Sequence, residues 1–89
     1  MTYRQLTVDF KSIPEMYIKE LAGVKPNTIR LMETLDIRKI VLDCWIEKED
    51  YGKIRIKNAD TNEYFTRKVT DVSIWSGWYI ISFESTSSL

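Results

Sequence analysis

Gly23-Val24-Lys25-Pro26-Asn27-Thr28-Ile29-Arg30 is the stretch from which the predicted fold is best read. Its glycine is a typical helix stop, because glycine readily adopts the left-handed conformation that ends many helices. Pro26 disfavours helical backbone at Lys25, so the chain must turn or extend there. The stretch therefore predicts the end of a helix at Gly23 and the start of a strand after Pro26.

The polar side chains of this stretch have a spacing that packing alone does not require. In a strand from 27 to 30, Thr28 and Arg30 point to the same face. Lys25 joins them only across the bend at Pro26. We therefore expect one ammonium group, one hydroxyl and one guanidinium at the mouth of a small pocket.

The residues before this stretch predict a strand and then a helix. Polar and apolar residues alternate from Tyr3 to Phe10, which is typical of a half-buried strand. Ser12 and Glu15 fit a capping box, so the helix is expected to begin there and to run to about Ala22. The residues expected on its buried face are Ile13, Met16, Tyr17 and Leu21, with Lys19 and Glu20 outside.

The segment after the stretch, from Leu31 to Asp50, allows two interpretations. The helical pattern uses Ile37, Ile40, Val41, Cys44 and Trp45, and the strand pattern uses Ile40, Leu42, Cys44 and Ile46. We favour a helix from about Asp36 to Trp45, because Asp36 can cap its first turn. The acidic run from Glu47 to Asp50 then predicts a solvated loop rather than a metal site.

The last third of the chain has a clear β pattern. Lys53 to Asn58 and Glu63 to Thr70 predict a hairpin around a polar turn, and Asp71 to Trp75 can extend its second arm. A turn at Ser76-Gly77 leads to a final strand from Trp78 to Glu84. Because both faces of that strand are apolar, we expect it to be central and doubly covered. Residues 85–89 are predicted to form a frayed tail.

Composition limits both the fold and the function. With 89 residues and 44% hydrophobic residues, we expect a single domain with one modest core. Thirteen basic residues balance thirteen acidic ones, so nucleic-acid binding would require a local patch. The chain has no histidine and one cysteine, Cys44, which excludes histidine-based nucleophile activation, an internal disulfide and the usual zinc sites.

Hydropathy and charge also predict where the protein is located. The first residues, Met1 to Gln5, have no apolar run after their charge, and no stretch approaches about eighteen apolar residues. We therefore expect neither a signal peptide nor a membrane span, and a cytoplasmic protein. No metal or cofactor is predicted.

The stretch from Gly23 to Arg30, placed after a short helix, resembles the signature of the ASCH domains of the PUA-like superfamily. In that signature a glycine, a lysine two residues on, an acidic residue or threonine, and an arginine recur at this spacing. The segments 67–72 and 79–83 are also similar to short phage and prophage proteins of this type. The resemblance covers residues 3–84 loosely and implies one domain over 1–89. Its implied fold class is α+β, a small mixed β-barrel with one or two helices and a cleft lined by the motif.

The resemblance implies a module that binds RNA or a nucleotide. Its implied ligand-binding residues are Lys25, Asn27, Thr28, Arg30, Arg55 and Arg67. Lys25 and Arg30 would meet phosphate or a base edge, while the hairpin cations widen the basic surface. The aromatic side chains that could stack on a base are Trp45, Trp75, Trp78 and Tyr79. The other interpretation of the hairpin cations is that they keep an exposed strand soluble.

Two further classes of function stay open. The stretch also resembles the small amidohydrolases that deacylate N4-acetylcytidine, which implies Lys25 as the general base and Thr28 as the nucleophile. Their catalytic glutamate lies in a segment that this chain lacks, and the possible substitutes are Glu47, Glu49 and Asp71. The third class is a protein-binding accessory factor that inhibits a host protein, which three tryptophans and five tyrosines would suit. We expect at least two of the tryptophans in the core.

Overall fold

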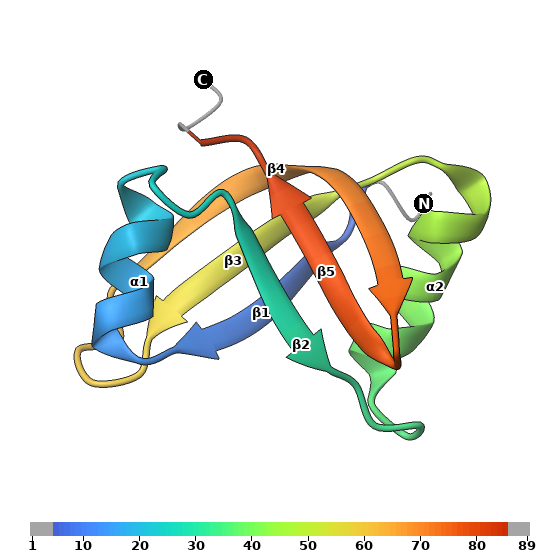
Figure 1. The fold of residues 1–89 in the computed structure, drawn as a ribbon, viewed down its shortest axis with the longest axis horizontal. Coiled ribbons are helices and arrows are strands. Elements are labelled where there is room, and N and C mark those ends of the chain that lie inside the picture. The colour runs from blue at the N-terminus through green and yellow to red at the C-terminus, as the bar shows by residue number, and fades with distance from the viewer. Residues whose placement is uncertain (1–4, 86–89) are drawn as a thin grey trace.

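Five strands and two helices make up the computed structural model, which describes residues 5–85 (Figure 1). In chain order they are β1 (Thr7–Ser12), α1 (Pro14–Leu21), β2 (Asn27–Leu31), α2 (Ile37–Lys48), β3 (Lys53–Asn58), β4 (Tyr64–Trp75) and β5 (Trp78–Phe83). The first residues of the predicted strand from Tyr3 to Phe10 lie outside the described residues, and so do residues 86–89 of the predicted tail.

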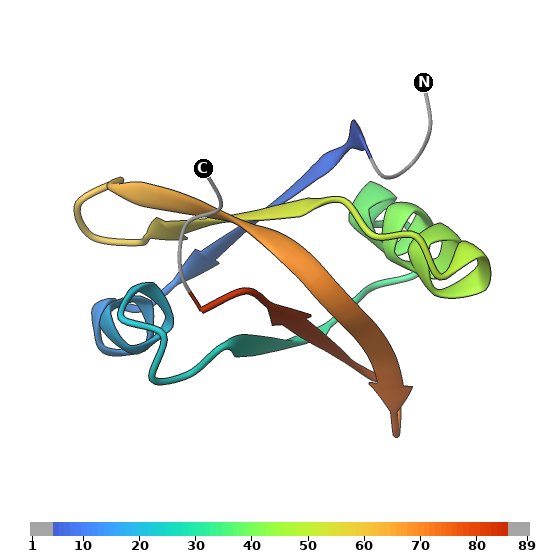
Figure 2. The same cartoon turned by 90° about the horizontal axis from the view of Figure 1, so that it is seen from above.

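The strands form one curled sheet in the order β1-β3-β4-β5-β2. Strands β1 and β3 are parallel, and the other neighbours are antiparallel. The first half of β4 pairs with β3 and its second half pairs with β5, with an irregularity between Val69 and Asp71. Seen from above, β4 crosses from the layer of β1 and β3 to the layer of β5 and β2 (Figure 2). The predicted α+β fold with a small mixed barrel is confirmed, as a half-barrel whose edge strands are β1 and β2.

The core lies inside this curl, and the two helices lie at opposite ends of it (Figure 1). Alternate residues of the strands point inward, which confirms the predicted alternation in β1 and in the hairpin of β3 and β4. The buried hydrophobic residues are Val8, Phe10, Tyr17, Met32, Leu42, Trp45, Ile54, Ile56, Phe65, Val69, Val72, Tyr79, Ile81 and Phe83.

Helix α2 confirms the helical interpretation of the ambiguous segment, although it continues to Lys48. The Asp36 side chain caps it by accepting from the Arg38 backbone N–H at 2.9 Å. Its buried face agrees with the predicted one only in part. Trp45 is fully buried as predicted, but Leu42 is fully buried as well, and Ile37 is 73% exposed. The face of α2 that contacts the sheet is therefore rotated by part of a turn from the face that the apolar pattern predicts.

Helix α1 differs from its prediction at both its start and its buried face. The capping box is wrong, because Ser12 is the last residue of β1 and Ile13 precedes the helix without a side-chain cap. Ser12 stays extended since it pairs in register with Asn58 of β3. The predicted buried face is also wrong in part, because Tyr17 and Glu20 are buried while Ile13 and Leu21 are exposed.

The last strand, β5, lies between β4 and β2, so it is central in the sheet as predicted. It is not doubly covered, because its alternate residues from Trp78 onward remain exposed or half-buried. Of the three tryptophans, Trp45 is buried, whereas Trp75 is 72% exposed and Trp78 is 43% exposed. The expectation of two core tryptophans is wrong, since Trp75 and Trp78 pair next to the β4–β5 turn, beyond the core.

Candidate functional site

The stretch from Gly23 to Arg30 leaves α1, turns and enters β2 as predicted. Gly23 has a φ of +77°, the left-handed conformation expected after a helix end, and its N–H donates to Glu20 O at 3.3 Å. The Lys25 N–H donates to Lys19 O at 3.1 Å, which satisfies another carbonyl of the last turn. Pro26 O accepts from the Phe83 N–H at 3.0 Å, so the bend is tied to β5.

Three predicted site residues of this stretch line one pocket. Arg30 Nε donates to Thr28 Oγ1 at 2.9 Å, which confirms that these side chains share a face of β2. Lys25 Nζ reaches across the bend and donates to Asn27 O at 3.2 Å. Lys25, Thr28 and Arg30 all line a pocket of about 440 Å³, and Asn27 contributes its backbone carbonyl to Lys25.

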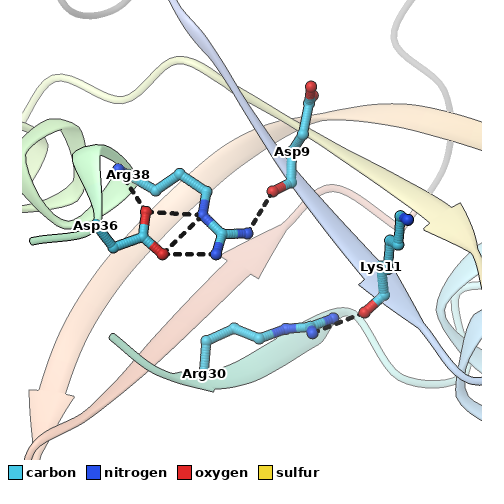
Figure 3. A network of polar contacts seen from close by, with 5 residues as sticks. All are labelled: Asp9, Lys11, Arg30, Asp36 and Arg38. Atoms are coloured by element: carbon cyan, nitrogen blue, oxygen red, sulfur yellow. Dashed lines mark hydrogen bonds and ion pairs between the residues drawn. The ribbon is translucent and has the colours of Figure 1, made fainter. Parts of the chain in front are cut away.

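Arg30 also joins the two edge strands of the sheet. Its Nη1 donates to Lys11 O and its Nη2 donates to Ser12 Oγ, both at 2.8 Å. Lys11 and Ser12 belong to β1 and Arg30 belongs to β2, the two strands at the edges of the sheet. One guanidinium therefore bridges a gap between strands that are not neighbours in the sheet (Figure 3). We call this gap between β1 and β2 the seam.

A second guanidinium reinforces the seam from α2. Arg38 Nη1 donates to Asp9 O at 2.8 Å, while the Asp36 carboxylate holds the other side of the same group (Figure 3). These bonds lower the pKa of Asp36 and raise that of Arg38. The guanidinium carbons of Arg30 and Arg38 lie 4.9 and 4.6 Å from the centre of the buried Phe10 ring. At the seam, the guanidinium groups of Arg30 and Arg38 therefore both pack against the Phe10 ring.

Two pockets meet along the seam. The basic pocket, of about 500 Å³, is lined by Asp9, Phe10, Lys11, Arg30, Arg38, Arg55 and Lys57. The Glu20 pocket, of about 440 Å³, is lined by Lys11, Ser12, Ile13, Met16, Glu20, Lys25, Thr28, Ile29 and Arg30. Because Lys11 and Arg30 line both, we treat the two pockets as one seam cleft.

The seam cleft is strongly basic although the chain has no net charge. Its cationic side chains are Lys11, Lys25, Arg30, Arg38, Arg55 and Lys57, and its carboxylates are Asp9 and Glu20. Arg55 forms a two-bond ion pair with Asp9, at 2.9 and 2.8 Å, and Arg38 is paired with Asp36, so part of this charge is neutralised locally. The cations outside these pairs create the local positive patch that nucleic-acid binding would require.

Glu20 is the site residue that the sequence prediction placed wrongly, on the outside of α1. Its side chain is only 1% exposed and lines the pocket of Lys25, Thr28 and Arg30. Within residues 5–85 its Oε1 has no hydrogen-bond partner. Burial lowers the pKa of Arg30, and the nearby charge of Glu20 opposes this effect.

Other predicted residues lie away from the seam cleft. Arg67 is 8% exposed, on the inner face of β4 opposite Ile54, and its Nη2 donates to Leu21 O at the end of α1. The prediction that it widens the basic surface with Arg55 is wrong, because Arg55 faces outward. Three proposed substitutes for the catalytic glutamate, Glu47, Glu49 and Asp71, do not line the Glu20 pocket.

Comparison of the chain with protein-family models and with curated proteins found no match. Neither α1 nor α2 has the length and apolar character that crossing a lipid bilayer requires. The described residues contain no cluster of three or more acidic, cysteine or histidine side chains that could hold a metal ion.

Proposed function

We propose that the chain binds RNA or a nucleotide and that the seam cleft is its binding site. The observation that carries this proposal is the gathering of six cationic side chains along one cleft of a chain with no net charge. Phosphate groups are bound in proteins chiefly by such cations, through charge-assisted hydrogen bonds.

Arg30 is the best placed of these cations to hold a phosphate. A guanidinium has five N–H donors, and the bonds to Thr28, Lys11 and Ser12 use three of them. These bonds fix the group where the two pockets meet, so a ligand need not order it on binding. The donors that remain can bind a phosphate oxygen in either pocket.

An aromatic side chain next to the basic pocket supports a stacking contact. Trp45 and Tyr79 are buried, so neither of these predicted side chains can stack on a base. Tyr64 is exposed instead, and the Arg55 guanidinium lies 5.4 Å from the centre of its ring. Base stacking on an exposed tyrosine beside a basic groove is a common mode of single-strand recognition.

We expect Lys57→Ala to weaken binding of a short single-stranded RNA and to reduce the salt slope of binding by about 1, because one phosphate contact is lost. Lys48→Ala removes an exposed lysine that lines neither pocket, so it is the matched control and should leave the slope unchanged. Fluorescence anisotropy at several salt concentrations measures both effects. Equal losses of affinity in Lys57→Ala and Lys48→Ala would indicate nonspecific attraction and contradict the proposal.

A second candidate function is the hydrolysis of an N4-acylcytidine. It is favoured by the carboxylate of Glu20, which lies in the same pocket as Lys25 and Thr28. In that reaction Thr28 Oγ would attack the acyl carbon, the bond to N4 would break with proton transfer to nitrogen, and water would release the acid. Lys25 Nζ donates to Asn27 O, and Thr28 Oγ1 accepts from Arg30, which favours binding over catalysis.

Release of acetate from N4-acetylcytidine distinguishes the two functions. We expect no acetate above background, and Thr28→Ala should change ligand affinity only by the roughly 0.5 to 1.5 kcal/mol of one neutral hydrogen bond. Turnover by the natural chain that disappears in both Thr28→Ala and Lys25→Ala would establish the enzyme instead.

A further inference from the structure

We propose that Glu20 recognises the exocyclic amino group of a nucleobase, so that the seam cleft prefers amino-bearing bases to uracil or hypoxanthine. This inference rests on the proposed function and specifies its ligand. The Glu20 pocket would hold the base, and the adjoining basic pocket would hold the phosphate.

Within residues 5–85 the buried Glu20 carboxylate has the charge of Arg30 in its surroundings, but it has no ion pair and no hydrogen bond at Oε1. Among the described residues, the ion pairs join Arg38 to Asp36, Lys39 to Asp43 and Arg55 to Asp9. Glu20 forms none of these pairs, and its buried Oε1 accepts no hydrogen bond there. A buried acceptor without a donor is unfavourable, because it has given up its bonds to water.

The position of Glu20 in α1 makes its burial more unfavourable still. It lies in the last turn of the helix, where the helix dipole disfavours a negative charge. The neighbouring Ile18 and Lys19 are exposed, so a glutamate on their side of the helix would be solvated. Because Glu20 lines the pocket, a ligand there that donates a hydrogen bond to its carboxylate would compensate for this unfavourable burial.

The donor and acceptor pattern of the pocket selects the kind of base edge. A carboxylate offers acceptors alone, so it pairs with an amino group and is repelled by a carbonyl. Thr28 Oγ1 accepts from Arg30 Nε, which leaves the Thr28 hydroxyl hydrogen to donate. An acceptor beside a donor matches a base edge with an amino group next to an unprotonated ring nitrogen. In cytosine these are the N4 amino group and N3, and in guanine they are the N2 amino group and N3, since guanine N1 carries a hydrogen. Uracil and hypoxanthine lack that amino group.

Binding of two nucleotide pairs tests this inference by isothermal titration calorimetry. GMP and inosine monophosphate differ only in the amino group at C2. CMP has an amino group at C4 and an unprotonated N3, where UMP has a carbonyl and an N3–H. We expect GMP and CMP to bind about tenfold or more tightly than their partners, the difference expected when a buried charged acceptor loses its donor.

Glu20→Gln should remove this preference while the phosphate contacts are retained, because an amide can turn to donate to a carbonyl as well as accept from an amino group. The matched control is Glu15→Gln, an exposed glutamate of the same helix that lines neither pocket, and it should keep the natural preference.

Equal affinity within both pairs for the natural chain would overturn the inference but leave nucleotide binding through phosphate intact. Absence of binding by all four nucleotides and by single-stranded RNA would overturn the proposed function as well. If Glu20→Gln does not fold, the affinity ratios of GMP to inosine monophosphate and of CMP to UMP, measured for the natural chain, decide by themselves whether the cleft prefers amino-bearing bases.

Discussion

Replacing Arg30 by alanine is expected to weaken RNA or nucleotide binding by about 10- to 100-fold, the effect of losing a hydrogen bond from a charged donor. Arg30 lines both pockets, and its hydrogen bonds join β2 to β1. The substitution should also lower the free energy of unfolding by about 2 to 3 kcal/mol, because Lys11 O and Ser12 Oγ lose a charged donor.

Two further variants separate these effects of Arg30. Arg30→Lys keeps the positive charge but not the planar fork, so we expect a folded protein with an intermediate affinity. Lys48→Ala is the control for general loss of charge. Circular dichroism reports whether each variant is folded, and anisotropy titrations give the affinities. An Arg30→Ala variant that folds and binds as well as Lys48→Ala would contradict the assignment of the site.

Gly23→Ala is expected to destabilise the fold by about 2 to 4 kcal/mol, because left-handed backbone strain is added to a steric clash. A Cβ at Gly23 would lie 2.7 Å from Ser85 O, a backbone atom that cannot easily move away. The added methyl group would also disturb the turn that positions Lys25 beside the Glu20 pocket.

Gly77 provides the matched control for this prediction. It has a φ of +83° but open space around its Cβ position. Gly77→Ala should therefore lower the free energy of unfolding only by the roughly 1 to 2 kcal/mol of backbone strain. Urea unfolding of the two variants measures the difference. Equal destabilisation would show that the contact between Gly23 and Ser85 does not constrain the turn.

Much of the secondary structure could be predicted from local patterns. The alternation in β1 and β3 and the helix stop at Gly23 each depend on a few neighbouring residues, and the structure confirms them. The capping box at Ser12 failed because pairing with β3 and the bond from Arg30 hold that residue in the strand. Tertiary contacts there override a local signal.

Two charged residues were placed on the wrong face although the sequence held a signal for each. Glu20 lies three and four positions after Tyr17 and Met16, in phase with the apolar stripe of α1. Arg67 alternates with Phe65 and Val69, in phase with the inner face of β4. Charge alone predicts both residues on the outside, whereas their phase predicts both on the inside. The phase is correct for both, since Glu20 and Arg67 are buried.

The seam itself could not be predicted from local patterns. It depends on the strand order, which brings Lys11 and Ser12 opposite Arg30 across 18 or more positions of the chain. The contribution of Arg38 depends in addition on how α2 lies beside β1. Such contacts arise from the folded topology, so residue types and spacing in one stretch do not reveal them.

The central claim is that the seam cleft is the ligand site, and amide chemical shifts of the ¹⁵N-labelled chain test it most directly. During titration with a short single-stranded RNA, we expect shifts that saturate and are concentrated at 9–12, 25–30 and 55–57. Shifts confined to the exposed tryptophans of β4 and β5, or no saturable shifts at all, would contradict the claim.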